Sequence, residues 1–178
     1  MIKNSIKVFA VLGVLVLGLV GVVFEDGVFA ADEEVKISET KMNGIINQCE
    51  TIIHDLKQVQ KQDARARVYF GGYYETILTK FITPMNMRLV ENNLSTVEFV
   101  ENQNNYLSAR TNFINDYINY QKNLEELITI NCKAESAKFY KKLETTRVGR
   151  EKVSDDIKKM SKLINKYSEL VKGVEAKI

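Results

Sequence analysis

Residues 42–59, MNGIINQCETIIHDLKQV, set the architecture of this 178-residue chain, because their large apolar side chains recur at alternating steps of three and four. This spacing lines one face of an α-helix and is the heptad pattern of helices that pack side by side. The positions are Met42, Ile45, Cys49, Ile52, Leu56 and Val59. An isolated helix is marginal in water, so the seam predicts an all-α protein in which this helix packs against partners.

The same spacing extends the first helix well beyond residue 59. The continuing positions are Asp63, Ala66, Phe70, Tyr73, Ile77 and Phe81. One helix is therefore expected from near residue 38 to near residue 92. The pair Gly71-Gly72 and the single proline, Pro84, each weaken or kink a helix. We expect the helix to bend near these residues, and a reversal of the chain at the glycines is the alternative.

Two further helical seams follow. Ser95 and Glu98 have the spacing of a capping box. Leu94 and Phe99 have the spacing of a hydrophobic staple, so a second helix is expected to begin at Ser95. Its seam comprises Phe99, Tyr106, Arg110, Phe113, Tyr117, Tyr120, Leu124 and Leu127. The seam of the third helix comprises Phe139, Leu143, Arg150, Val153, Ile157, Met160, Ile164, Tyr167, Val171 and Val174.

The two cysteines of the chain, Cys49 and Cys132, decide between these layouts. In an oxidising compartment an even pair predicts a disulfide, and closing so long a loop contributes roughly 4 to 5 kcal/mol. A reversal at the glycines would leave the cysteines roughly 30 Å apart, because each helical residue rises about 1.5 Å. A disulfide cannot span that distance. We therefore expect an antiparallel three-helix bundle of long, coiled-coil-like helices that run up, down and up.

The disulfide also fixes the heights of charged residues along the helices. Measured from the cysteines, Asp63 stands at about 21 Å and Arg150 at about 20 Å, so they should be neighbours. Arg110 stands at about 33 Å, level with Gly71-Gly72 and one turn from Glu75. The glycines leave room for the arginine, and Glu75 supplies the opposite charge. Both pairs are predicted to favour one alignment of the helices over its heptad-shifted rivals.

The first thirty residues have the layout of a secretory signal peptide. Two lysines precede a run of apolar residues and glycine at 8–24, and a small-residue cleavage motif ends at Ala30. We expect residues 1–30 to be removed, leaving residues 31–178 as a single helical-bundle domain. An uncleaved anchor is the alternative, since roughly 17 apolar residues lie at the lower limit for crossing a membrane. In both cases the body is expected to be extracytoplasmic, whether secreted, periplasmic or held at the cell envelope.

The sequence offers few side chains for catalysis. His54 is the only histidine, so a Ser-His-Asp relay or a histidine-based metal site has at most one such member. Gly71-Gly72 lacks the spaced glycines and the following lysine of a phosphate-binding loop. We therefore predict a non-enzymatic protein with no cofactor and no bound metal.

The most unusual local composition is a group of arginines and tyrosines. Its members are Arg65, Arg67, Tyr69, Tyr73 and Tyr74. Both residue types are favoured at protein interfaces, so the group is a candidate partner surface for an unknown protein. Helical periodicity must turn some of these residues into the bundle, and core packing is the alternative explanation.

Charge is distributed unevenly. Residues 133–178 hold 13 basic and 7 acidic residues, which favours contact with an anionic envelope component, or with acidic neighbours inside the bundle. A net charge of only +2 in an exported chain argues against nucleic acid. Met42 and Ile45 offer leftover apolar surface through which two copies can pair. A structural, scaffolding or interaction role is expected, and an extracytoplasmic ligand-binding or sensory bundle with a cavity between helices is the alternative.

Overall fold

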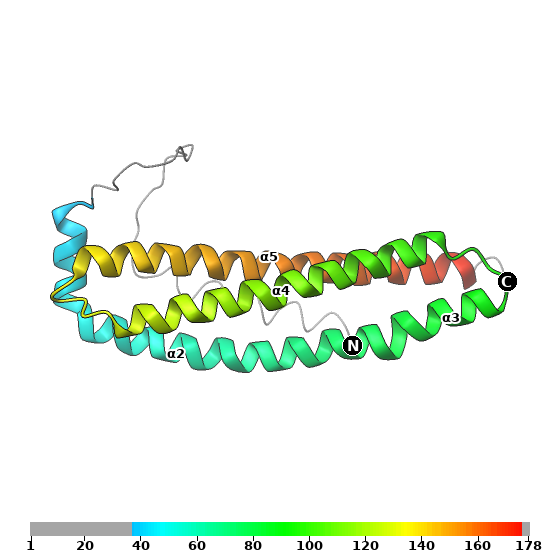
Figure 1. Cartoon of the computed structure of the whole chain (residues 1–178), viewed down its shortest axis with the longest axis horizontal. Helices are drawn as coiled ribbons and strands as arrows, with labels where there is room; N and C mark the ends of the chain where they lie inside the picture. The colour runs from blue at the N-terminus through cyan, green and yellow to red at the C-terminus, as the bar shows by residue number, and fades with distance from the viewer. Residues whose placement is uncertain (1–36, 176–178) are drawn as a thin grey trace. The chain divides into compact units, whose positions relative to one another are not determined.

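A computed structural model describes residues 37–175, so the predicted signal peptide at residues 1–30 lies outside the described part. The helices are α2 Glu39–Ile77, the π-helix η2 Leu78–Ile82, α3 Thr83–Glu91, α4 Val97–Thr129 and α5 Ser136–Glu175. α2, η2 and α3 follow one another without a break and form one helical segment, named here the first rod. The first rod, α4 and α5 run up, down and up (Figure 1). This arrangement confirms the predicted antiparallel three-helix bundle.

Both ends of the first rod are capped by hydrogen bonds from nearby residues of the chain. The side chain of Ser38 accepts a hydrogen bond from the Lys41 backbone N–H at 3.4 Å, which caps the start of α2. At the other end Asn93 adopts a positive φ of 55°, and the Leu94 N–H donates to the Leu89 carbonyl at 2.9 Å. This is a Schellman motif in which asparagine takes the left-handed position.

The capping box predicted at Ser95 is wrong. α4 begins at Val97, its N-cap residue is Thr96, and that side chain makes no capping hydrogen bond. Leu94 belongs to the motif that ends α3, so its position is set by the preceding helix rather than by the following one. The position of Leu94 was consistent both with the end of α3 and with the start of α4.

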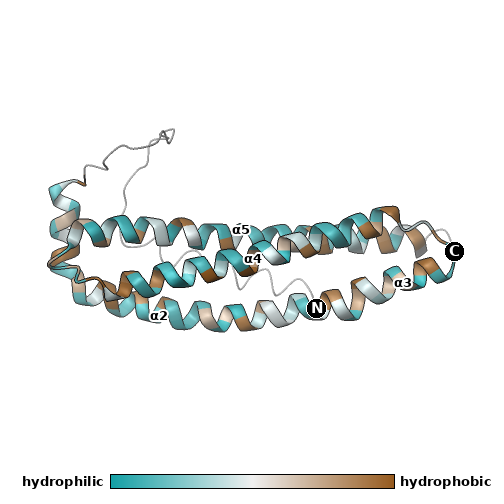
Figure 2. Ribbon diagram, in the orientation of Figure 1, coloured by the Kyte–Doolittle hydropathy of each residue, from teal (hydrophilic) through white to brown (hydrophobic). Residues whose placement is uncertain are grey.

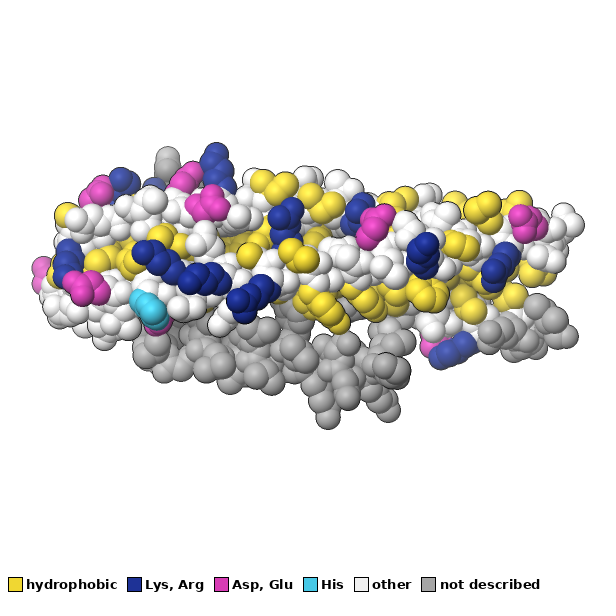
Figure 3. All heavy atoms as spheres, turned by 90° about the horizontal axis from the view of Figure 1, so that it is seen from below, with side chains coloured by type: hydrophobic (Ala, Val, Ile, Leu, Met, Phe, Trp, Pro, Cys, Tyr) yellow, Lys and Arg dark blue, Asp and Glu magenta, His cyan; other side chains and the backbone are white. Residues whose placement is uncertain are grey.

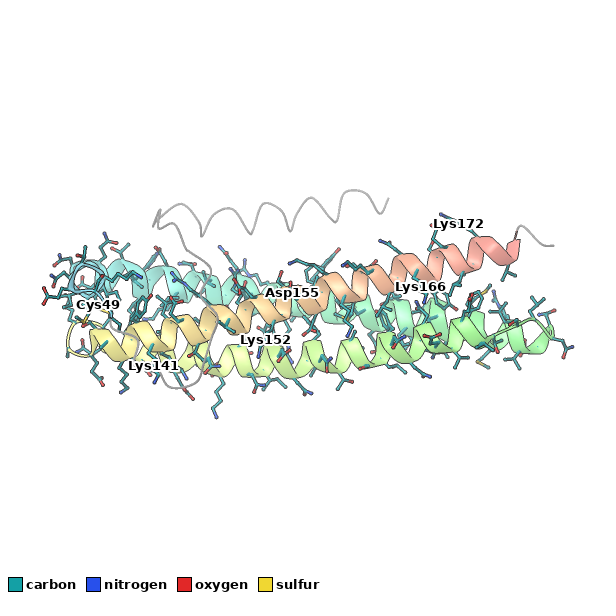
Figure 4. All side chains as sticks on the ribbon, turned by 90° about the horizontal axis from the view of Figure 1, so that it is seen from above. Cys49, Lys141, Lys152, Asp155, Lys166 and Lys172 are labelled. Carbon is teal, nitrogen blue, oxygen red and sulfur yellow. A yellow bond between two sulfur atoms is a disulfide. The ribbon has the colours of Figure 1, made fainter. Side chains whose placement is uncertain are left out.

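The irregular part of the first rod lies between Gly71-Gly72 and Pro84, where the bend was predicted. In η2 the Thr83 N–H donates to the Leu78 carbonyl, five residues back instead of four. Pro84 has no N–H to donate to the preceding turn, so the proline and the wide turn occur together. Figures 1 and 4 also show that the first turns of α2 cross the end of the bundle.

The buried face of the first rod departs from the predicted seam after Phe70. Tyr74, Leu78 and Ile82 are buried, whereas the predicted seam residues Tyr73 and Phe81 are 38% and 58% exposed. A straight α-helix drifts by about 20° per heptad relative to a strict seven-residue repeat. Over several heptads this drift moves the buried face by one residue. From Phe70 to Ile82 the inward-facing positions therefore recur every four residues.

The core lies where the three segments meet and is rich in tyrosine. α4 contributes more large buried side chains than any other helix, and they are Phe99, Tyr106, Phe113, Tyr117, Tyr120, Leu124 and Leu127. α4 and α5 approach closely, because a Cβ placed on Gly149 would lie 3.4 Å from the Tyr120 Cα atom. Figure 2 shows polar and apolar residues alternating along every helix, as expected of amphipathic helices around a shared core.

Candidate functional site

The Cys49–Cys132 disulfide joins α2 to the connection between α4 and α5, as predicted. The two Cα atoms lie 5.7 Å apart, and 83 residues separate the cysteines along the chain. Cys132 is fully buried and Cys49 is 8% exposed, so the bond is part of the core. Its position fixes the height of the first rod relative to the other two helices.

A polar cluster of one residue from each segment lies further along the bundle. The Asp63 carboxylate accepts hydrogen bonds from Arg150 Nε at 2.9 Å, from Arg150 Nη2 at 3.0 Å and from the Tyr120 hydroxyl at 2.6 Å. The hydrogen bond to Asp63 raises the pKa of Arg150 despite partial burial, which acts in the opposite direction. Burial, with the nearby negative charge of Asp63, raises the pKa of the Tyr120 hydroxyl. The cluster holds a fixed charge pair and a neutral tyrosine.

The second predicted pair, Arg110 and Glu75, is also in contact. Arg110 Nη2 lies 2.6 Å from Glu75 Oε2, with the two side chains 33% and 47% exposed. A Cβ at Gly71 or Gly72 would meet nothing within 4 Å, so space surrounds this part of α2. Because both side chains are a third or more exposed, the pair contributes about 0–1 kcal/mol.

The predicted partner surface needs one correction. Tyr74 is only 1% exposed and lies against the rings of Phe70, Tyr106 and Phe113, so it belongs to the core. The drift of the buried face described above turned it inward. Arg67 is exposed, and its guanidinium stacks over the Tyr117 ring at 5.2 Å.

Three further members of the predicted partner surface also reach solvent. Tyr69 is 59% exposed, Tyr73 is 38% exposed, and Arg65 is also exposed. These three residues lie on α2 within nine positions of one another. The Arg/Tyr surface, defined from here on as Arg65, Tyr69 and Tyr73, comprises the exposed members that follow one another at steps of four along α2; Arg67 lies outside this row.

Polar residues at the η2 end of the bundle are satisfied by one another. Gln103 accepts from Asn86 at 2.6 Å and donates to Thr83 at 3.2 Å. The Tyr167 hydroxyl lies 2.6 Å from Asn86 Oδ1 and 3.0 Å from the Ile82 carbonyl. In the same region the Tyr106 hydroxyl donates to the Tyr74 carbonyl at 3.0 Å. These contacts hold the irregular turn to the other helices and leave those groups occupied.

A surface groove of about 340 Å³ lies between η2, α3 and α5. Its lining is mainly apolar, and Lys80 and Arg88 contribute the positive charges. Phe81 contributes an aromatic ring that is 58% exposed. Sequence reasoning missed this groove because it placed Phe81 in the seam, and the π-helix that displaces it has no reliable sequence signature apart from the nearby Pro84.

A carboxylate pair between α4 and α5 was also missed. Burial and the neighbouring Asp116 raise the pKa of Asp156 to about 6. Asp156 Oδ2 is buried and has no hydrogen-bond partner, as expected when two acceptors face each other. Asp116 and Asp156 are forty residues apart in sequence, so only the packed helices bring them together.

Two other site types are absent from residues 37–175. No group of three or more His, Cys, Asp or Glu side chains in that range is arranged to hold a metal ion. No helix within it has the length and apolar character needed to cross a membrane. Comparisons of the chain with protein-family models, with curated proteins and with solved structures found no match.

Proposed function

We propose that this chain is an exported, non-enzymatic helical-bundle protein with a structural, scaffolding or interaction role at the cell envelope or outside the cell. The Cys49–Cys132 disulfide carries the proposal, because buried structural disulfides persist mainly in oxidising compartments. The signal-like layout of residues 1–30 supports the same location. Helices with heptad seams suit a coiled-coil-like spacer that presents outer faces to partners.

The polar chemistry inside the bundle supports an interaction role over catalysis. The Asp63–Arg150–Tyr120 cluster and the contacts around Gln103 engage their members with one another. A catalytic acid or base must instead reach a reacting group in a site open to substrate. These partly buried polar groups therefore serve to align the helices, which leaves function to the outer surface.

The outer surface offers two kinds of contact. The Arg/Tyr surface suits a protein partner, because arginine and tyrosine combine apolar area with directed hydrogen bonds. On α5, Lys141, Lys152 and Lys166 are exposed and project outward (Figure 4), which suits an anionic envelope component. Other α5 lysines bind acids: Lys142 contacts Glu126, and Lys158 contacts Asp155. The basic excess of α5 is thus partly neutralised within the bundle.

Cellular fractionation with N-terminal sequencing tests the proposed location. The protein should be recovered outside the cytoplasm with Ala31 as its first residue. A maleimide reagent should modify neither cysteine until a reductant is added, whereas the Cys49→Ser variant should be modified at Cys132 after denaturation without reductant. A cytosolic protein with reactive thiols in the parent chain would contradict the proposal.

The groove favours the second candidate, an extracytoplasmic ligand-binding bundle. An apolar lining with Lys80 and Arg88 suits an amphipathic molecule that has one anionic head group. Adding a long-chain fatty acid should raise the melting temperature if the folded protein binds it selectively. The charge reversal Arg88→Glu should remove that rise, and Lys152→Glu on α5 should not. Equal rises in both variants would indicate unspecific binding.

A further inference from the structure

α4 carries a second apolar seam on its outer face. Its large members are Val97, Val100, Leu107, Ile114 and Ile118, which are 74%, 43%, 38%, 38% and 53% exposed. With Asn104 and Thr111 they occupy consecutive positions at alternating steps of three and four. They therefore form a heptad seam, named here the outer seam, with the period of the buried seam on the same helix. No other helix among residues 37–175 covers it.

The outer seam carries no charge at any of its seven positions. Of the charged residues along this part of α4, Arg110 contacts Glu75 and Asp116 faces Asp156, while Glu98 and Glu101 lie outside the seven seam positions. Charge depletion is a feature of interface centres, whereas a solvated helix face normally carries Lys and Glu. Figure 3 shows apolar side chains recurring along the upper edge of the bundle, where α4 runs.

The order of residues in the outer seam indicates which partner can pack against it. From Val97 to Ile118 the seam reads Val, Val, Asn, Leu, Thr, Ile, Ile. The pattern of polar and apolar residues is the same when the series is read from either end. Two apolar residues come first, then one polar residue, and then the leucine at the centre. A two-fold axis pairs one surface with itself, so a self-complementary stripe suits a second copy of the chain in antiparallel orientation.

We propose that two copies associate through the outer seam, with their α4 helices antiparallel and the two-fold axis near Leu107. Val97 stands about 15 Å from Leu107 along the helix, and Ile118 stands about 16 Å from it on the other side. Each valine end therefore lies level with the isoleucine end of the second copy. Asn104 of one copy lies level with Thr111 of the other, where the two polar side chains can hydrogen-bond.

The length of the contact is sufficient for a helix pair. The outer seam spans about 32 Å of helix at 1.5 Å per residue. The region around Met42 and Ile45, predicted for self-association, is not available, because Ile45 is only 7% exposed and Met42 is half-buried. This inference does not depend on where the protein is located.

Thiol cross-linking of protein from cells expressing the full chain tests the arrangement directly. Both native cysteines are bonded to each other, so an introduced thiol is the reactive one. Leu107→Cys, near the axis, should give covalent dimers with a short bismaleimide. Ile118→Cys alone should not, because its two thiols lie about 32 Å apart. A mixture of Val97→Cys and Ile118→Cys chains should cross-link to each other. Failure at position 107, or equal cross-linking with Ile118→Cys alone, would overturn the proposal.

Sedimentation analysis with matched variants supplies the second measurement. Ile118→Glu places one charge at each end of the apolar contact and should raise the dimer dissociation constant at least tenfold, so that monomer predominates. Val148→Glu on α5 is the control, because Val148 is 52% exposed and Ile118 is 53% exposed. Circular dichroism checks that both variants remain helical. A parent protein that is monomeric, or that cross-links from position 107 to a different protein, refutes the second copy as partner.

Discussion

Replacing Asp63 by alanine should lower the free energy of unfolding more than removal of any surface ion pair in this bundle. The change removes the common acceptor of Arg150 and Tyr120, two residues on different helices. The Asp63 side chain is 15% exposed, and Tyr120 is only 2% exposed. The hydroxyl and the guanidinium then lose their partner while the tight α4–α5 contact limits rearrangement.

The size of the effect follows from exposure. Breaking a fully buried pair by removing one partner costs about 3–5 kcal/mol, because the remaining charge stays buried. The Arg150 side chain is 33% exposed, so water can solvate part of its guanidinium. We therefore expect a loss of about 2–3 kcal/mol for Asp63→Ala. Arg150→Met should cost less, because Asp63 keeps the Tyr120 hydrogen bond.

A double-mutant cycle measured by urea unfolding tests this reasoning. The parent, Asp63→Ala, Arg150→Met and the double variant are compared with the disulfide intact, and unfolding is followed by far-ultraviolet circular dichroism. The coupling energy should be about 1–3 kcal/mol, since the residues share hydrogen bonds. Additive effects within about 0.5 kcal/mol would show that the contact does not stabilise the fold. Arg147→Met, which breaks an exposed pair on one helix, serves as the control and should change stability by less than 1 kcal/mol.

Three further predictions concern the whole bundle. Replacing Cys49 and Cys132 by serine opens an 83-residue separation and should cost about 4.5 kcal/mol in the chain-entropy model, seen as a lower urea midpoint; an unchanged midpoint contradicts this. Asp156→Asn should stabilise the fold by about 1–2 kcal/mol near pH 7.5, after allowance for partial exposure. The folded pKa of Asp156 is raised to about 6, so the protonated carboxyl favours the folded state at low pH, and this contribution is lost as pH rises through that value. The stabilisation by Asp156→Asn should therefore vanish near pH 4. Burial raises the pKa of Tyr74 and of Tyr167 to about 12, so stability should fall above pH 10, and tyrosinate absorbance from them should appear only with unfolding.

The heptad spacing and the two cysteines were sufficient to predict the layout of the bundle. Spacing identified the helices, and the reach of a disulfide excluded a reversal at Gly71-Gly72. Heights calculated from the disulfide also predicted that Asp63 lies beside Arg150, because the rise per residue is nearly constant in long helices. Errors arose where the helix is not regular or where two signals overlap, as at Leu94, which ends α3 instead of starting α4.

The groove and the Asp116–Asp156 pair could not be predicted from the spacing of residues in the sequence. The groove depends on the outward turn of Phe81, which follows from helical drift and from the π-turn at Leu78–Ile82. Asp116 and Asp156 meet only because α4 and α5 pack at one rotation. A rotation of either helix by one residue would separate them, and helical periodicity fixes rotation less precisely than height.

α4 presents two seams of equal period, and spacing alone does not determine which one is buried. The buried seam is aromatic, and the outer seam is aliphatic with two short polar residues. The first rod favours the aromatic choice, because carbonyl groups in η2 and in the last turn of α2 accept bonds from hydroxyl donors. Tyr106 reaches the Tyr74 carbonyl, and Tyr167 on α5 reaches the Ile82 carbonyl. Valine, leucine and isoleucine cannot donate such bonds, so they remain on the outer face of α4, away from these carbonyl groups.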